Sequence, residues 1–201
     1  TALVLAFMTE AAYAASDESR GDISIQVPVN MRKYCPSHTL RNFSMYFSVR
    51  TPRAKAGDAQ QLLPDISRQL AEGGSEQSMR RMLASTTQMV HLLSCVPLAV
   101  KRPAARLAYG FLGERAFTST LSNLGAARLP EDVAPHVRKL DFVLGTGEQS
   151  RAACAMVTLG RCAVLSVTKL TEDKSFETRL LELFDAADVP VKLSGSMLYG
   201  A

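Results

Sequence analysis

Residues 27–50 read VPVNMRKYCPSHTLRNFSMYFSVR, and this stretch decides the expected architecture. It opens as the end of an alternating run, 22–29, in which Ile and Val alternate with other residues as in a half-buried strand. A polar, basic loop with Pro36 and three hydroxyl residues follows, and 42–49 forms a second strand-like run. Loops held by a rigid sheet often carry function. The stretch therefore predicts one wall of a ligand site.

Two features refine this pair of strands. Pro28 lacks an amide hydrogen, so we expect it in an edge strand or where pairing ends. Over 43–48, Phe and Met alternate with Ser44, Tyr46 and Ser48, which predicts one face toward the core and one face of hydroxyls. Such a polar face is either simply solvated or lines a site, and the alternation alone does not choose between them.

The bulk composition is that of a globular protein with one domain, 1–201. The chain has 201 residues, of which 47% are hydrophobic and 21% charged. Its net charge is +4, but no run of five basic residues occurs, and the aromatic residues are eight Phe, five Tyr and no Trp. A nucleic-acid binder usually has a denser basic stripe. We therefore expect no nucleic-acid partner, whereas the mild positive charge suits an anionic, phosphate-bearing thioester co-substrate.

The cysteines and the amino end indicate a cytoplasmic protein. Cys35, Cys95, Cys154 and Cys162 form no CxxC pair, so we expect buried, reduced thiols and no metal site. Residues 1–16 have the apolar stripe of an amphipathic helix, without the basic start of a signal peptide. Because the chain starts without Met inside this helix, we expect it to be cut from a longer protein. No apolar run has the length of a membrane span, and we expect no membrane partner.

The rest of the chain alternates between helical and strand periodicity. Helices are expected at 58–71 and 75–93, short helices lying across the sheet at 92–112, and a helix at 175–187. Further strands are expected at 117–125, 137–144, 152–159, 162–170 and 190–196. The prediction is an α/β (α+β) fold, with a mixed, mostly-β sheet of six to seven strands backed by helices on one face.

No complete active site is visible in the residues. None of the three histidines is followed four residues later by Asp, and there is no Gly-x-Ser-x-Gly elbow or phosphate-binding glycine loop. Hydroxyl and amide side chains do gather at 119–123 and at 42–46, and such groups hold oxyanions in other proteins. The alternative is that Ser-Asn-Leu-Gly at 122–125 is a turn that caps its own backbone.

Two long motifs resemble a known family. The stretch 27–50, followed by VPLAVKRPAARLAYGFLGERAFTSTLSNLGAARLPEDV at 96–133, resembles the carboxy-terminal half of condensation-domain-like acyltransferases. The match is best to the bacterial alcohol acetyltransferase-like group, which has the chloramphenicol acetyltransferase fold, and it covers essentially the whole chain. Such enzymes have two similar halves with a substrate tunnel between them. Their His-His-x-x-x-Asp-Gly motif ends the first half and has no copy here.

The resemblance implies a carboxy-terminal subdomain that forms one wall of the tunnel, without the catalytic histidine. It implies no catalytic residue in this chain, and acyl or oxyanion placement by Ser122 and Asn123. The remaining implied substrate contacts are Asn30, Arg32, Asn42, Ser44 and Tyr46. The implied partners are the amino-terminal half, an acyl-CoA or acyl-carrier thioester, and an alcohol or amine acceptor. No bound cofactor or metal is expected.

Two functions remain open at this point. One is the tunnel wall of a thioester-dependent O- or N-acyltransferase, with this chain alone inactive. The other is a non-catalytic module of the same fold that docks a carrier or partner protein. In either case an open half would expose its inner sheet face, so self-association is also expected.

Overall fold

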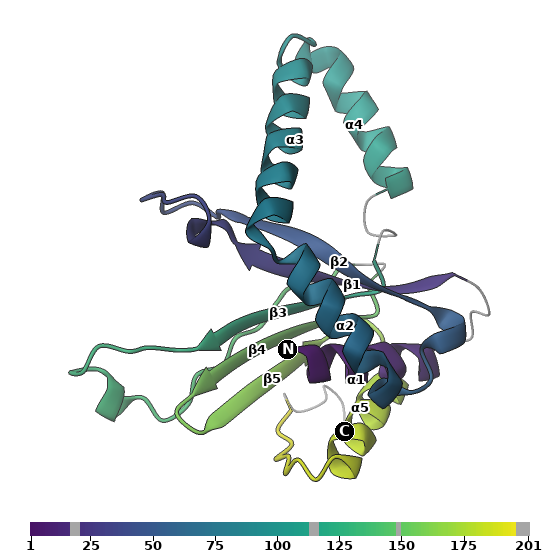
Figure 1. Ribbon diagram of the computed structural model, residues 1–201, viewed down its shortest axis with the longest axis vertical. Helices are drawn as coiled ribbons and strands as arrows, with labels where there is room; N and C mark the ends of the chain where they lie inside the picture. Colours follow the sequence, from purple (N-terminus) through teal and green to yellow (C-terminus); the bar gives the residue numbers. More distant parts are fainter. Residues whose placement is uncertain (17–20, 113–116, 148–149, 196–201) are drawn as a thin grey trace.

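The computed structural model describes residues 1–16, 21–112, 117–147 and 150–195, and is built around one five-stranded mixed sheet (Figure 1). The strands are β1 (Asp22–Asn30), β2 (Ser44–Pro52), β3 (Ser119–Ala126), β4 (Ala152–Leu159) and β5 (Cys162–Thr168). Their order is β2-β1-β3-β4-β5. The central pairs β1–β3 and β3–β4 are parallel, and the outer pairs β1–β2 and β4–β5 are antiparallel.

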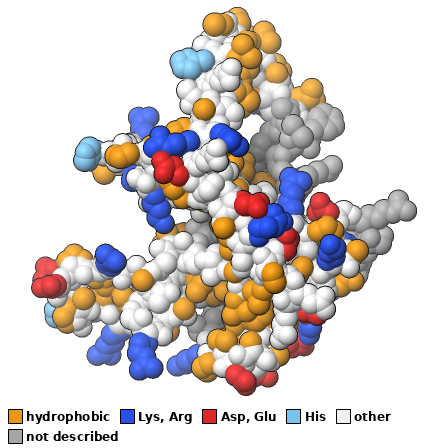
Figure 2. Space-filling view, in the orientation of Figure 1, with side chains coloured by type: hydrophobic (Ala, Val, Ile, Leu, Met, Phe, Trp, Pro, Cys, Tyr) orange, Lys and Arg blue, Asp and Glu red, His pale blue; other side chains and the backbone are white. Residues whose placement is uncertain are grey.

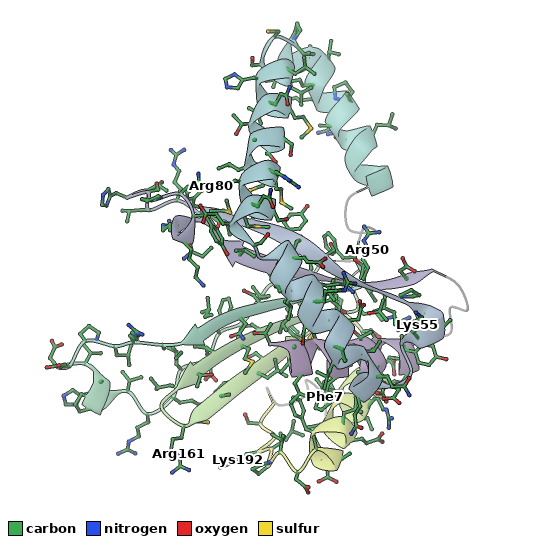
Figure 3. The ribbon with its side chains drawn as sticks, viewed as in Figure 1. Phe7, Arg50, Lys55, Arg80, Arg161 and Lys192 are labelled. Carbon is green, nitrogen blue, oxygen red and sulfur yellow. The ribbon has the colours of Figure 1, made fainter. Side chains whose placement is uncertain are left out.

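Helix α1 (Ala2–Ala14) is the centre of the core. All nine residues from Val4 to Ala12 are buried, Thr9 and Glu10 included, so the helix is buried on every side rather than along the one stripe expected. It packs against β1 and against two further helices, α2 (Ala59–Gly73) and α5 (Ser175–Ala186). Phe7 points from α1 toward α5, where its ring meets Phe184 edge-on at 5.2 Å between centroids (Figure 3).

The predicted alternation sets which residues face these helices. Ile23, Ile25 and Val49 belong to the core cluster, and the pairing of β1 with β2 places them on one face. The even-numbered residues of β1 and β2 lie on the opposite face, as expected for a strand. The expectation for Pro28 holds on one side only. The pairing of β1 with β3 ends at Gln26, two residues before Pro28, but β1 is an inner strand and its pairing with β2 continues through Pro28 to Asn30.

Helices α3 (Glu76–Ser94) and α4 (Leu98–Leu112) form a hairpin that projects from the sheet (Figure 1). The helix expected at 75–93 is confirmed, with the Ser75 hydroxyl accepting a hydrogen bond from the Ser78 amide. The expectation of short helices across the sheet is wrong. Pro103 lies inside one continuous helix, α4, and only Met79 of the apolar residues of α3 is buried.

Two of the expected strands are absent from the described residues. The first, 137–144, is unpaired. Its last residue, Leu144, lies over the face of β5, where its carbonyl accepts a hydrogen bond from Thr168 Oγ1 at 2.8 Å. The second, 190–196, is exposed and irregular up to residue 195, and 196 lies outside the described residues. The sheet therefore has five strands instead of six or seven. No helix in the described part of the chain is long and apolar enough to cross a membrane.

Candidate functional site

The candidate site is the sheet face opposite α1, α2 and α5, here called the polar face. Its centre is a row of residues in register across all five strands. In strand order the row is Ser48, Gln26, Thr120, Ala153 and Thr168. Four of the five side chains are polar, and a row of this kind presents several hydrogen-bonding groups on a rigid backbone.

Hydrogen bonds hold this row in place. Thr120 Oγ1 donates to Gln26 Oε1 at 3.2 Å, which joins β3 to β1 through their side chains. The backbone amide of Ser24 donates to Thr118 Oγ1 at 3.2 Å; these two residues precede Gln26 and Thr120, respectively, by two positions. The Ser24 hydroxyl is buried and has no hydrogen-bond partner among the described residues. A buried hydroxyl without a partner is costly, so it is a group that a ligand could satisfy.

Ser122 and Tyr46 lie on the same face, one step beyond the row. Ser122 is half-buried, two residues after Thr120 in β3, and pairs with Ala155 of β4. Tyr46 is 52% exposed in the edge strand, and its ring meets Phe117 edge-on at 6.2 Å between centroids. The structure therefore places these two expected contact residues on one surface. Phe117, just before β3, forms the rim beside Tyr46.

Asn123 lies on the other face of the sheet. Its Nδ2 donates to Thr1 Oγ1 at 2.8 Å, at the start of α1, and its Oδ1 accepts from the Gly125 amide at 2.8 Å. Consecutive strand residues point to opposite faces, so the side chains of Ser122 and Asn123 are not brought together. The bond to Gly125 is the backbone-capping turn that the sequence left open, and Gly125 has a left-handed φ of 74°.

The other four expected contact residues lie in the loop between β1 and β2 or at the strand ends that flank it, and their hydrogen bonds stay within this region. Asn30 Oδ1 accepts from the Arg32 amide at 3.0 Å, and the Arg32 guanidinium donates to the carbonyls of Thr39 and Arg41. Ser44 Oγ donates to Asn42 Oδ1 at 2.7 Å. These residues close their own loop at the far end of the strand pair. Their arrangement supports a structural role, since no bond links them to the row around Gln26.

The histidines and the buried cysteine lie elsewhere. His38 is in the β1–β2 loop, His91 in α3 and His136 in a 3₁₀ turn, Ala134–His136, so none is on the polar face. Cys154 is buried among core residues, where desolvation, and then the charge of Glu177, raises the pKa of its thiol to about 12. No group of three His, Cys, Asp or Glu residues that could hold a metal occurs in the described part.

The cysteines partly depart from expectation. All four are free, as predicted. Only Cys154 is buried, however, while Cys35 is half-buried and Cys95 and Cys162 are exposed. Apolar neighbours in the sequence suggested burial for Cys95. Cys95 directly follows α3, however, and the carboxy-terminal end of that helix is exposed.

Sequence reasoning missed three residues of the polar face, Ser24, Gln26 and Thr168. A signal for the first two was present, since Ser24 and Gln26 alternate with the core residues of β1. No local pattern in the sequence could have shown that Thr168 lies on the same face, because this depends on the order of the strands in the sheet.

Comparison with known proteins gives similarity in structure only. No protein-family model matches the chain, and no curated protein matches it in sequence. Its structure is similar to the epimerization domain from the third module of tyrocidine synthetase B, with 14% identity and a TM-score of 0.46 over 92% of this chain and 41% of that one. It is also similar to the structure that shows condensation domain-mediated chain release from the enacyloxin polyketide synthase, with 14% identity and a TM-score of 0.42 over 98% and 38% of the two chains. The chain thus spans about two fifths of the length of either structure.

Proposed function

We propose that this chain forms one wall of the substrate site of an acyltransferase, which moves an acyl group from a thioester to an alcohol or amine. The observation that carries the proposal is the polar face, a sheet surface on which none of the helices α1, α2 and α5 packs. It is lined by Ser48, Gln26 and Thr120, with Ser122 and Tyr46 beside them. The reaction class comes from the sequence resemblance of 27–50 and 96–133, whose strand residues supply much of this surface.

The chemistry of the polar face suits binding and charge stabilisation. Hydroxyl groups can donate hydrogen bonds to an acyl carbonyl as negative charge develops on it. They do not take a proton from an acceptor alcohol at neutral pH, which needs a base such as histidine. Because no histidine in the described part lies on the polar face, the base would come from another part of the protein. The amino-terminal half is our candidate for that part.

Ser122 is the residue to test, because it is half-buried on the polar face and beside Ala155. The full-length protein would be assayed for ester or amide formation from acetyl-CoA and other acyl thioesters with small alcohols and amines. Ser122→Ala should lower kcat by about 10²-fold if the hydroxyl stabilises the oxyanion. Asn123→Ala should lower it far less, because that side chain bonds to Thr1 behind the sheet.

The matched control is Ser67→Ala, an exposed serine of α2 on the opposite side of the sheet. It should leave turnover unchanged. If Ser122→Ala has the rate of Ser67→Ala, Ser122 is not in the site. If no thioester is consumed with any acceptor, the acyltransferase proposal fails as a whole.

A second candidate is a non-catalytic module that docks a carrier or partner protein. It is favoured by the exposed ring of Tyr46, since tyrosines are enriched in protein interfaces, and by the fact that no histidine of the described residues lies on the polar face. In this case Tyr46→Ala should weaken binding of an acylated carrier protein in calorimetry, with no thioester consumed. Thioester turnover by the full-length protein would decide for the first candidate.

A further inference from the structure

The α3–α4 hairpin exposes a group of large apolar side chains at its tip (Figure 2). Six of these lie within residues 89–100, and a seventh is one or two turns further along α4. They are Met89, Val90, Leu92, Leu93, Leu98, Val100 and Leu107, each at least 44% exposed. Exposed apolar groups of this size mark sites of interaction with a protein or a membrane.

Beyond Glu76, the first residue of α3, the charge along the hairpin is of one sign. Residues 77–112 contain no Asp or Glu, but they contain Arg80, Arg81, Lys101, Arg102 and Arg106. Since the whole chain has a net charge of +4, this segment carries its entire positive excess and the remainder is nearly neutral. An apolar tip with a purely basic surround is complementary to a surface that is apolar inside and anionic outside.

The basic residues are available for an external anion. Arg80 pairs with Glu76 at 2.7 Å, but in the described part of the chain no carboxylate pairs with Arg81, Lys101, Arg102 or Arg106. Arg102 and Arg106 lie one turn apart on α4 and, with Pro103 and Leu107, line a shallow surface depression. Two guanidinium groups beside an apolar surface suit a phosphate that carries an acyl chain.

We propose that the tip of this hairpin docks into the interface of an anionic phospholipid bilayer. The apolar residues at 89–100 enter the headgroup region, while Lys101, Arg102 and Arg106 contact lipid phosphates. Such attachment involves one leaflet only and requires no membrane-spanning helix, so it is compatible with the finding that no described helix could cross a membrane. It does depart from the expectation, made from the sequence, that the protein has no membrane partner. A second copy of the chain is disfavoured as the occupant, because tip-to-tip contact would bring Lys101, Arg102 and Arg106 of one copy toward the same residues of the other. The proposal is independent of acyl transfer.

The experiment is vesicle co-sedimentation of the full chain, with vesicles of phosphatidylcholine alone and of an equimolar mixture with phosphatidylglycerol. We expect binding to the anionic vesicles that falls as salt is raised, and much weaker binding to the neutral ones. Arg102→Glu with Arg106→Glu should weaken binding at least about tenfold, since each basic residue near such a surface contributes about fivefold. The matched control, Arg138→Glu with Arg161→Glu, reverses two exposed arginines outside the hairpin and should have a smaller effect.

A fluorescence measurement tests the apolar contact separately. The chain has no tryptophan, so Leu92→Trp creates a single reporter at the tip and Leu170→Trp a control on an exposed site elsewhere. Only the Leu92→Trp emission should shift to shorter wavelength with anionic vesicles, and Leu92→Asp should reduce sedimentation. Failure to bind, equal loss with both arginine pairs, or an unshifted emission would overturn the proposal. A dimer that Leu92→Asp converts to monomer, with no vesicle binding, would assign the tip to a second copy instead.

Discussion

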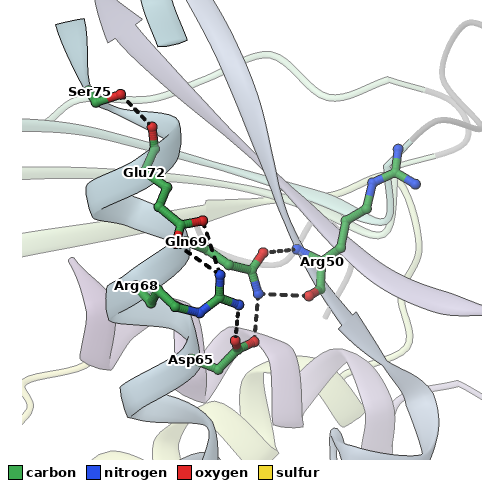
Figure 4. Close-up of polar contacts among 6 residues, drawn as sticks. All are labelled: Arg50, Asp65, Arg68, Gln69, Glu72 and Ser75. Atoms are coloured by element: carbon green, nitrogen blue, oxygen red, sulfur yellow. Dashed lines mark hydrogen bonds and ion pairs between the residues drawn. The ribbon is translucent and has the colours of Figure 1, made fainter. Parts of the chain in front are cut away.

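The side-chain amide of Gln69 makes both hydrogen bonds that a neighbouring strand would make to Arg50 (Figure 4). Gln69 Oε1 accepts from the Arg50 amide, and Gln69 Nε2 donates to the Arg50 carbonyl, each at 2.9 Å. Arg50 lies in β2, an edge strand of the sheet. Asp65 fixes the amide by accepting from Nε2 at 2.7 Å, and Arg68 joins Asp65 to Glu72 along the same helix. A helix side chain thus closes part of an open edge.

Replacing Gln69 by Leu should destabilise the protein and expose this edge. The substitution keeps the size of the side chain but leaves the amide and carbonyl of Arg50 without these partners, which should lower the free energy of unfolding by about 1–3 kcal/mol. Urea denaturation measures this change. Gln60→Leu, at an exposed position of the same helix, is the control and should alter stability little. Equal urea midpoints for Gln69→Leu and Gln60→Leu would show that the contact with Arg50 contributes nothing to stability.

The buried carboxylate of Glu10 gives a second prediction. Its Oε2 accepts from the Ala59 amide at 2.7 Å, and its Oε1 accepts from Arg179 Nη2 at 2.5 Å and Nε at 3.1 Å. Glu10 is 7% exposed at its side chain and Arg179 is 40% exposed. Arg179→Met should therefore cost about 1–3 kcal/mol, below the value for a fully buried pair, because water reaches the guanidinium.

The control for this pair is Arg68→Met. Arg68 also makes two ion pairs, with Asp65 and Glu72, but all three side chains are about half exposed or more. Surface pairs of this kind contribute little, so Arg68→Met should lower the midpoint temperature of thermal unfolding much less than Arg179→Met does. A larger loss at Arg68 would contradict the assignment of Glu10 and Arg179 as a core contact.

The four thiols should differ sharply in reactivity. Because the thiolate is the nucleophile, the raised pKa of Cys154, about 12, leaves almost none of it reactive at neutral pH, and burial also blocks access. Cys95 and Cys162 are exposed and should be alkylated first by iodoacetamide, with Cys35 slower. Peptide mass spectrometry after timed alkylation checks this order. Labelling of native Cys154 as fast as Cys162 would show that the core opens at β4.

Local pattern predicted the strands well and the wider arrangement less well. Period-two alternation is a property of neighbouring residues, which is why both faces of β1 and β2 followed from the sequence. The run 137–144 also has apolar residues at alternate positions, but a strand forms only where the segment pairs with a sheet edge, and the end of this segment, Leu144, lies over the face of β5 instead. For the candidate site, the resemblance implied contacts by Ser122, Asn123 and Tyr46 alike. In the structure Ser122 and Tyr46 share the polar face, whereas Asn123, adjacent to Ser122 in the strand, faces the other side.

The α3–α4 hairpin shows a second limit. Apolar residues at helical spacing predicted the helix correctly. The same spacing occurs both in helices that pack into a core and in helices that expose an apolar contact surface, so it did not predict exposure. Exposure is decided by what the rest of the chain can cover, and here α1 already occupies the place between the sheet, α2 and α5. The hairpin is left outside that core.

The burial of α1 has a consequence for how the chain folds. Glu10 meets Arg179, 169 residues later in the chain, and Phe7 meets Phe184. The apolar surface of α1 therefore leaves the ribosome long before the helix that covers part of it has been made. Non-local contacts of this kind slow folding, and until they form the apolar surface of α1 remains exposed and prone to aggregation. Newly synthesised chains should accordingly depend on chaperones, and a translation stop before α5 should yield an insoluble product.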